Sequence, residues 1–227
     1  KDLRIIAYEA TFFQNAGAAA DLSPAVLERT LFHCTNSYYI PNVKARAYSC
    51  RTHLPPNTAF RGFGGPQGMF VIESAIAKAA ESLGIDAAII QKKNLLKTGN
   101  EFPYGQAAVS EAGQCWDKAS TKYDIDTIRK EITTFNDKNT LHKKGIAMMP
   151  VCFGISFTNT MMNQGRALVH VFNDGSVSIA TGAIEMGQGV NTKILQVAAK
   201  VFSINPDKIK LQTTSTHKIA NTSPSAA

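Results

Sequence analysis

The stretch that most constrains how this chain can fold is glycine-rich, residues 58–69 (TAFRGFGGPQGM), and it directly precedes a strongly helical segment. Glycine adopts positive φ and lets the backbone approach a ligand closely. Because Pro66 suits a first turn, we expect a helix to begin there with its free N–H groups facing the loop. Such helix ends attract anions, and the Arg61 guanidinium adds planar donors for an oxyanion. The pattern alone fits equally well a tight turn in which Phe60 and Phe63 are core residues.

Two later segments repeat this arrangement. Residues 186–189 (MGQG) precede a helical pattern, and Gln188 offers both a donor and an acceptor. Residues 221–227 (NTSPSAA) read as a third helix start. Three helix N-termini that converge on one ligand would suit a phosphate-bearing or oxo-anionic cofactor. None of the three matches a Walker loop or a dinucleotide fingerprint.

Composition narrows the class of protein. With 44% hydrophobic and 18% charged residues, the 227-residue chain reads as a soluble globule. No apolar run reaches the roughly 20 residues of a membrane helix, and the N-terminus is no signal peptide. The absence of an initial Met indicates a piece of a longer protein. The net charge of +7 comes from scattered residues rather than a basic run interleaved with aromatics, so nucleic-acid binding is a distant alternative.

The potential metal ligands show no metal-site spacing. The cysteines form no C-x-x-C pair, and the histidines are isolated from one another. We therefore expect free thiols in a reducing, cytoplasmic setting, and no metal bound directly by side chains. The residues concerned are Cys34, Cys50, Cys115 and Cys152, and His33, His53, His142, His170 and His217.

In the first part of the chain, strands and helices are mixed. Ser23 and Pro24 should open a helix as cap and first residue, Gly84 should end the helix after the glycine loop, and Asp86 should cap the next. The apolar stripe of the first helix comprises Val26, Leu27, Leu31 and Phe32. Arg29 lies off this stripe, which by composition alone favours a solvent-facing arginine. The ranges expected are strands at 3–13 and 43–54, helices at 23–33, 66–83, 87–96, 114–121 and 124–137, and a loop at 97–113.

After residue 140 the pattern changes, and we place a boundary near residues 140–145. Asp174-Gly175 is a strong hairpin signal. The ranges expected are a strand at 145–151, hairpin strands at 167–172 and 176–181, a helix at 191–202 and a strand at 208–214. Because strands and helices mix without strict alternation, the fold class is α+β.

Four segments in the same order resemble the large molybdenum subunit of the xanthine oxidase/aldehyde oxidase family. They are residues 57–67 (NTAFRGFGGPQ), 153–158 (FGISFT), 185–189 (EMGQG) and 221–227. The resemblance covers essentially all 227 residues and implies a truncated molybdopterin-binding domain, with mixed sheets and helices. Since that subunit is far longer, the chain resembles an internal fragment that lies after a first Gly-Phe-Gly-Gly loop and before a catalytic glutamate.

The resemblance also implies a cofactor. Family members bind molybdenum through a molybdopterin, and the protein surrounds the metal with hydrogen bonds instead of ligating it. By matching motif positions, Arg61, Gly187 and Gln188 would contact the cofactor. Ala227 would lie beside the molybdenum through its backbone, with Ala226 nearby. Iron–sulfur clusters and FAD would reside on other domains or subunits.

For the substrate, the resemblance implies a purine. Phe63 and Phe157 match the aromatic pair that sandwiches a flat heterocycle, face-on and edge-on. Thr158 would offer a hydroxyl. Arg29 aligns with the arginine of the xanthine-oxidising branch, where a cation stabilises negative charge on the ring. Gly62 stands where carbon-monoxide-oxidising relatives have cysteine.

The expected activity is hydroxylation of hypoxanthine or xanthine with oxygen derived from water. The alternatives are a relative that oxidises aldehydes or other N-heterocycles, and an inactive structural module. The two catalytic glutamates of the family lie outside this sequence, and we do not assign their roles to Glu73, Glu101 or Glu185. Glu185 is expected to have a local structural role, and the chain alone to be inactive.

Overall fold

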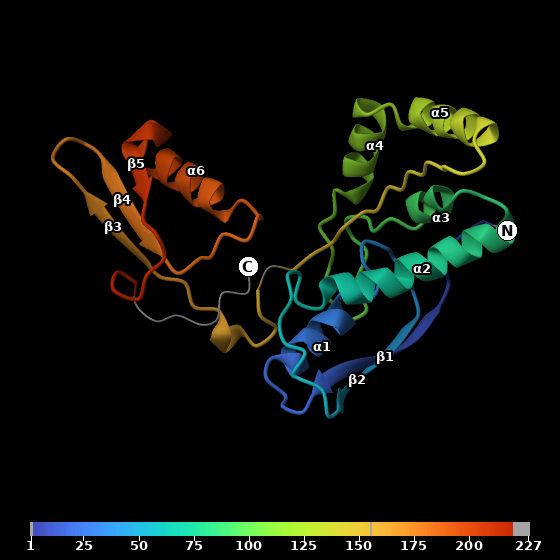
Figure 1. Cartoon of the computed structure of the whole chain (residues 1–227), viewed down its shortest axis with the longest axis horizontal. Coiled ribbons are helices and arrows are strands. Elements are labelled where there is room, and N and C mark those ends of the chain that lie inside the picture. The colour runs from blue at the N-terminus through green and yellow to red at the C-terminus, as the bar shows by residue number, and fades with distance from the viewer. Residues whose placement is uncertain (1, 155, 220–227) are drawn as a thin grey trace. The chain divides into compact units, whose positions relative to one another are not determined.

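A computed structural model describes residues 2–154 and 156–219, and the chain divides into two compact units after Phe153 (Figure 1). Each unit combines helices with a small sheet, which confirms the α+β class. The first unit contains β1 (Tyr8–Gly17), α1 (Ser23–Phe32), β2 (Val43–Arg51), α2 (Gly65–Leu83), α3 (Ala87–Lys93), α4 (Ala112–Lys122) and α5 (Ile125–Lys138). The second contains η1 (Thr160–Met162), β3 (Ala167–Val171), β4 (Val177–Thr181), α6 (Val190–Phe202), η2 (Pro206–Lys208) and β5 (Ile209–Leu211).

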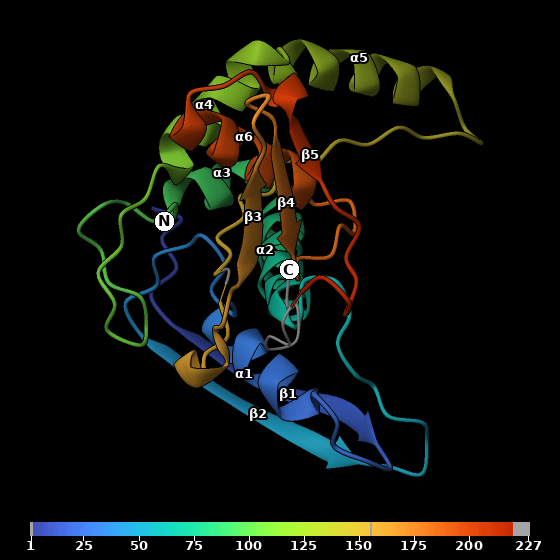
Figure 2. The same cartoon turned by 90° about the vertical axis from the view of Figure 1, so that its left-hand side faces the viewer.

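The first unit opens with a β-α-β arrangement. β1 and β2 are parallel, and α1, which connects them, covers one face of the pair (Figure 2). The strand expected at 3–13 instead runs from Tyr8 to Gly17. Asn15 does not end it, because the register shifts between Asn15 and Gly17 and the ladder continues as a bulge.

Helices α2 and α3 begin largely as predicted. α2 starts at Gly65 with Pro66 in its first turn and is closed by left-handed Gly84. The Asp86 side chain accepts a 2.8 Å hydrogen bond from the Ala88 N–H, which confirms the predicted cap. α3 stops at Lys93 rather than near residue 96. The reason is Asn94, whose side chain donates to Leu3 O and accepts from Ile5 N–H, so the chain turns away to meet the N-terminal segment.

Ser23 does not cap α1. Leu22 occupies the cap position, and the buried Ser23 hydroxyl donates to Asn57 O at 2.8 Å. The bond instead ties the start of α1 to the segment that leads into the glycine loop.

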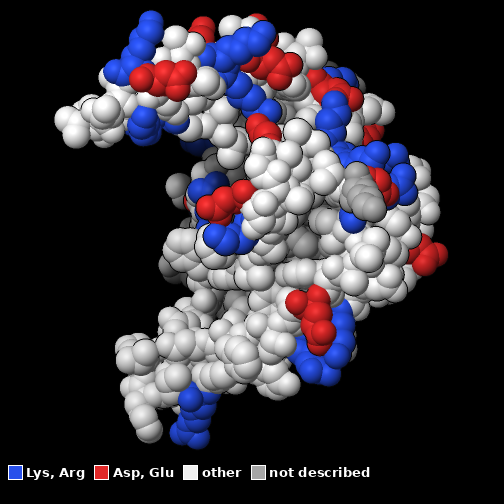
Figure 3. All heavy atoms as spheres, turned by 90° about the vertical axis from the view of Figure 1, so that its right-hand side faces the viewer, with Lys and Arg blue, Asp and Glu red and all other residues white. Residues whose placement is uncertain are grey.

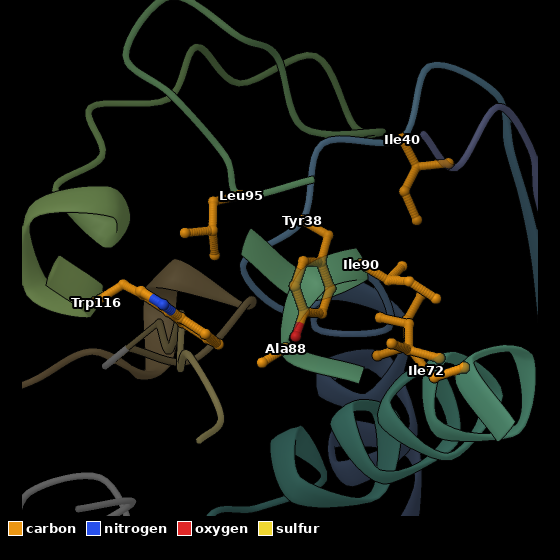
Figure 4. Packing of buried hydrophobic residues seen from close by; sticks show 9 residues of the cluster. Tyr38, Ile40, Ile72, Ala88, Ile90, Leu95 and Trp116 are labelled. Carbon is orange, nitrogen blue, oxygen red and sulfur yellow. The ribbon is translucent and has the colours of Figure 1, made fainter. Parts of the chain in front are cut away.

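The core of the first unit lies between α2, α3 and α4. Ile72, Ile76 and Ala80 recur at helical spacing along the buried side of α2. They pack in one cluster with Tyr38, Ile40, Ala88, Ile90, Leu95 and Trp116 (Figure 4). This packing fixes the position of α2, and therefore of the glycine loop at its N-terminus.

Residues 142–154 form neither a helix nor a strand, so the strand expected at 145–151 is wrong. The apolar residues of this segment do not pair with a neighbouring strand. Side-chain bonds hold the segment instead. The Asn36 amide donates to Pro150 O at 2.8 Å, and its oxygen accepts from the Cys152 N–H at 3.2 Å.

The second unit is built on the predicted hairpin. β3 and β4 are antiparallel, and Gly175 has φ +77° in the turn between them. β4 and β5 are parallel and joined through α6, with a core of Val177, Ile179, Ala198 and Ile209. β5 is shorter than the strand expected at 208–214, because only Ile209–Leu211 pair with β4.

The surface charges are mixed. On the face drawn in Figure 3, Lys and Arg are scattered beside Asp and Glu. Several are paired, including Lys92 with Asp117 at 2.7 Å and Arg129 with Asp86 at 2.9 Å. All four cysteines are unpaired. Within the described residues, no helix is long and apolar enough to cross a membrane.

Candidate functional site

The glycine loop is locked against α1. The Thr30 hydroxyl lies 3.1 Å from Val26 O and 3.0 Å from Gly64 O, and it accepts a 2.7 Å bond from the Gln14 side chain on β1. Gly64 has φ +102°, and a Cβ there would lie 2.1 Å from Val26 O. Contact this close requires glycine, so the loop and α1 form one rigid element.

Within this loop the two predicted site residues differ in exposure. Arg61 is exposed, as is Phe60, with 78% of its surface accessible. Phe63 is buried and has φ +50°, an uncommon conformation for a large side chain. Strained residues of this kind cluster at ligand sites when the surroundings over-determine them. The Phe63 N–H donates to Phe60 O, which helps to hold the turn.

Arg29 is buried at 4% exposure, so the expectation of a solvent-facing arginine is wrong. The buried face of α1 carries Val26, Arg29, Thr30 and, just past its end, His33, while Phe32 of the predicted apolar stripe is 40% exposed. Burial lowers the pKa of the Arg29 guanidinium from its ordinary value. The guanidinium carbon lies 5.2 Å from the centroid of the Phe153 ring. A cation at that distance is attracted to the aromatic face.

His33 stands beside Arg29. Its Nδ1 lies 2.8 Å from Arg29 O, and because a carbonyl only accepts, Nδ1 carries the proton. Burial is the main cause that lowers the pKa of His33, and the nearby Arg29 charge acts in the same direction. A neutral His33 therefore leaves Arg29 as the cation of this cluster.

In the second unit, Asn163 clasps Phe157. The Asn163 side chain accepts from the Phe157 N–H at 2.8 Å and donates to Phe157 O at 3.0 Å. Phe157 is 6% exposed, whereas Thr158 beside it is exposed. The clasp fixes the backbone that carries both predicted substrate residues.

The turn before α6 is held by two side chains of its own motif. Gln188 accepts from the Met186 N–H at 2.6 Å and donates to Ile184 O at 2.7 Å. Glu185 accepts from the N–H groups of Gly187, Gly189 and Asn191 at 2.8, 2.9 and 3.1 Å. These bonds, that to Asn191 first, hold the pKa of Glu185 below its ordinary value. The local structural role expected for Glu185 is confirmed.

This arrangement changes the interpretation of the α6 N-terminus. The Asn191 N–H in its first turn already binds the Glu185 carboxylate, as do the N–H groups of Gly187 and Gly189 just before the helix, so this end is partly occupied and is not the fully open anion cradle that the sequence suggested. Gln188 keeps one further amide hydrogen, because an amide NH₂ has two and the Ile184 bond uses one. The residues fit an oxo-anionic group that accepts from this amide.

Two predicted residues, Ala226 and Ala227, lie outside the described residues. Within the described ranges 2–154 and 156–219, no group of three or more His, Cys, Asp or Glu side chains gathers as a metal site. Sequence reasoning missed the contact of Phe153 with Arg29 and the bonds that Asn36 makes to residues 150–152. The signal available for Phe153 was its place at the head of the FGISFT segment.

Comparison with known proteins identifies the class. Residues 1–95 and residues 118–227 each match the family model of a molybdopterin cofactor-binding domain. The chain is 42% identical over 224 residues to xanthine dehydrogenase/oxidase of Mus musculus, a match that covers 98% of this chain and 17% of that protein. It is 41% identical over 227 residues to nicotinate hydroxylase of Emericella nidulans, covering 99% of this chain and 17% of that protein.

Solved structures show the same fold. The aldehyde oxidoreductase from Desulfovibrio gigas matches with a TM-score of 0.74 at 22% identity, over 99% of this chain and 24% of that one. Quinoline 2-oxidoreductase from Pseudomonas putida 86 matches with a TM-score of 0.73 at 20% identity, over 98% of this chain and 30% of that one.

Together these matches define a molybdopterin cofactor-binding protein. More narrowly, the chain belongs to the xanthine oxidase family, among the xanthine dehydrogenase-like molybdenum hydroxylases. It spans about a sixth of the length of the family members it matches.

We predict that Glu185→Ala loosens the turn before α6 more than Glu185→Gln does. Alanine removes the acceptor of three N–H groups, whereas glutamine keeps one oxygen. Amide hydrogen exchange at Gly187, Gly189 and Asn191 should accelerate severalfold in the alanine variant and less in the glutamine variant. Because the folded pKa of Glu185 is lowered, its contribution is present above the unfolded pKa and lost as pH falls through the folded one. Unchanged exchange in both variants would contradict the capping role.

Proposed function

We propose that this chain is the molybdopterin-binding part of an enzyme that hydroxylates purines, hypoxanthine or xanthine, with oxygen derived from water. The observation that carries the proposal is the buried Arg29, held on α1 against the glycine loop. Burial on the side of α1 that meets the glycine loop gives this guanidinium a fixed place, and a fixed cation can stabilise the negative charge that develops on a bound ring. The 42% identity to a xanthine dehydrogenase/oxidase supports the same substrate class.

For the cofactor, we assign Arg61, Gly187, Gln188, Ala226 and Ala227. The exposed Arg61 supplies a planar cationic donor, and Gln188 supplies an amide N–H whose direction is set by the Ile184 and Met186 backbone. The glycine at position 187 allows the turn, with φ +95°. When bound, the molybdenum cofactor supplies the two-electron redox chemistry of the hydroxylation.

For the substrate, we assign Phe63 and Phe157 as the aromatic pair, Thr158 as a hydrogen-bonding hydroxyl, and Arg29 as the catalytic cation. Both phenyl rings are buried and have fixed backbones, one in a strained turn and one in the Asn163 clasp. A buried aromatic ring with a fixed backbone can pack on a flat heterocycle, and an exposed hydroxyl can form a hydrogen bond with the edge of such a ring. Arg29 then stabilises the negative charge that develops on the ring.

Further partners belong to the proposal. We propose that the remaining parts of the large subunit, together with iron–sulfur and flavin domains or subunits, complete the enzyme in the cytoplasm. Exposed apolar side chains support the proposal that other parts of the enzyme cover these surfaces. Among them are the stacked Phe13 and Tyr48 on the β1–β2 pair and Val171 on β3. We also propose that residues 1–227 form one partial cofactor-binding domain with an internal boundary near 140–145, in the segment between the end of α5 and the division into compact units after Phe153.

The second candidate function is oxidation of another N-heterocycle. It is favoured by the 41% identity to a nicotinate hydroxylase, almost the same as that to the xanthine dehydrogenase/oxidase. An aldehyde substrate is less favoured, since an aldehyde builds no charge on a ring opposite Arg29. A further alternative is that the chain by itself is only a structural module.

We predict that the complete enzyme turns over xanthine with a higher kcat/KM than nicotinate or benzaldehyde. Steady-state assays of the molybdenum-loaded enzyme on these three compounds test the assignment directly. Preference for nicotinate would select the second candidate.

We predict that chain 1–227 alone shows no xanthine turnover, because losing general base catalysis costs on the order of 10²–10⁴-fold. Robust turnover by that chain would place the base within it and contradict the proposed division of roles.

A further inference from the structure

Phe153 has no role in the function proposed above, although it heads the FGISFT segment that also carries Phe157 and Thr158. In the first unit its ring centroid lies 5.2 Å from the guanidinium carbon of Arg29 and 5.0 Å from the centroid of the His33 ring. We propose that Phe153 is a positioning residue, whose ring holds the Arg29 guanidinium in the orientation that acts on the substrate. This inference rests on the proposed function of Arg29.

The ring has a defined seat on the N-terminus of α2. A Cβ added to Gly65 would lie 2.5 Å from Phe153 Cε2 and 3.0 Å from Cδ2. The ring therefore lies directly against the Gly65 backbone, in space that any other residue at position 65 would fill. The ring also contacts Arg29 of α1 and His33, which lies just past the end of that helix. The Phe153 ring therefore contacts both the end of the glycine loop, at Gly65, and α1, at Arg29.

A tether places the ring in this seat. Residues 142–154 have no strand partner, so their position depends on side-chain bonds. Asn36, 2% exposed, donates to Pro150 O and accepts from the Cys152 N–H directly before Phe153. The same Asn36 amide donates to Glu73 of α2 at 2.8 Å, and Glu73 also accepts from Tyr38 in the core. The chain of bonds runs from the core to Phe153.

This geometry explains how a long side chain is fixed. An arginine has several rotatable bonds, and a neighbouring aromatic face restricts the plane of its guanidinium. A well-placed cation acts mainly on the transition state, and a displacement of about 1 Å can cost roughly 10²-fold in rate. Loss of the ring should therefore lower kcat for a purine while its KM changes little. An aldehyde, which does not use Arg29, should be unaffected.

The test uses the complete, molybdenum-loaded enzyme that carries this chain. Phe153→Leu should lower kcat for xanthine about ten- to hundredfold, with KM within about twofold and benzaldehyde turnover unchanged. Phe153→Tyr, which keeps the ring, should retain most of the xanthine activity. Phe32→Leu is the matched control, because Phe32 lies on α1 with 40% exposure against 37% for Phe153 and packs on Tyr104 instead.

A double variant separates positioning from a general structural effect. If Phe153 acts through Arg29, adding Phe153→Leu to Arg29→Met should cause no further loss of xanthine turnover. A further loss, an equal loss for both substrates, or unchanged kinetics would each overturn the proposal. Should Phe153→Leu fail to fold, Phe153→Met is read by the same criteria.

Failure of the proposed function can be distinguished from failure of the positioning role of Phe153. If the unmodified enzyme does not oxidise xanthine, the substrate assignment fails, and the positioning role is then judged from crystal structures without substrate. A shifted or disordered Arg29 guanidinium in Phe153→Leu, with α1 unchanged, supports positioning. An Arg29 guanidinium that keeps its place overturns it.

Discussion

Arg29→Met is expected to lower kcat for xanthine by about 10²–10³-fold in the complete enzyme, with a much smaller change in ground-state binding. The reason is that removal of one well-placed electrostatic donor costs roughly 3–4 kcal/mol of transition-state stabilisation. Benzaldehyde has no purine ring on which negative charge could develop, so its rate of oxidation should be unchanged or higher. The measurement is kcat/KM for both substrates in both enzymes.

The structure sharpens this experiment. A surface arginine would change stability by no more than about 0.5 kcal/mol, but Arg29 is 4% exposed and packs on Phe153. Methionine fills much of the same volume without the desolvated charge, so a folded variant is expected. Arg46→Met serves as the control, since Arg46 is an exposed arginine on β2. Equal effects on both substrates, or none, would remove Arg29 from the site.

Several elements were predictable because a local signal decided them. Asp174-Gly175 gave the β3–β4 hairpin, Asp86 gave the start of α3, and Gly84 gave the end of α2. In each case one residue determines a turn or a cap through its own backbone or side chain, without help from distant residues. The motifs that resembled the molybdenum hydroxylases fall in the same category, since each is a contiguous segment.

What could not be predicted depended on distant contacts. The strand expected at 145–151 has apolar residues but no partner ladder, and Asn36, more than a hundred residues earlier, holds the segment instead. α1 buries a polar face with Arg29 and Thr30 because that face meets the glycine loop. Periodicity alone pointed to a stripe of Val26, Leu27, Leu31 and Phe32, of which only Val26 is buried. A helical pattern states which residues share a face but not which surface that face meets.

The candidate site likewise contains residues that a local sequence signal identified and contacts between residues far apart in the sequence. Phe63 and Gln188 came from contiguous motifs, and the structure shows a fixed backbone around each. Glu185 as an acceptor for three N–H groups followed from its own turn. The contact between Arg29 and Phe153 joins residues more than a hundred positions apart, so only the fold could reveal it.

The second large effect is expected on stability, at Gly64. Gly64→Ala should destabilise the chain by about 2–6 kcal/mol, because it combines a strained backbone with overpacking. Gly64 has φ +102°, and its Cβ would meet Val26 O at 2.1 Å and Thr30 Oγ1 at 2.9 Å. Both atoms belong to α1, so the helix must move away from the loop. Arg29, on the same helix, would move with it.

Two glycine variants separate these causes when unfolding is followed in urea. Gly99 has φ +91° but open space around its Cβ, so Gly99→Ala measures the backbone cost alone, about 1–3 kcal/mol. Gly113 lies in α4 with open space, and Gly113→Ala should stabilise by roughly 0.5–1 kcal/mol. If Gly64→Ala costs no more than Gly99→Ala, the close contact with Val26 does not hold the glycine loop against α1. A larger loss of unfolding free energy for Gly64→Ala, together with loss of xanthine turnover in the complete enzyme, would support the conclusion that the close contact at Gly64 helps to position Arg29.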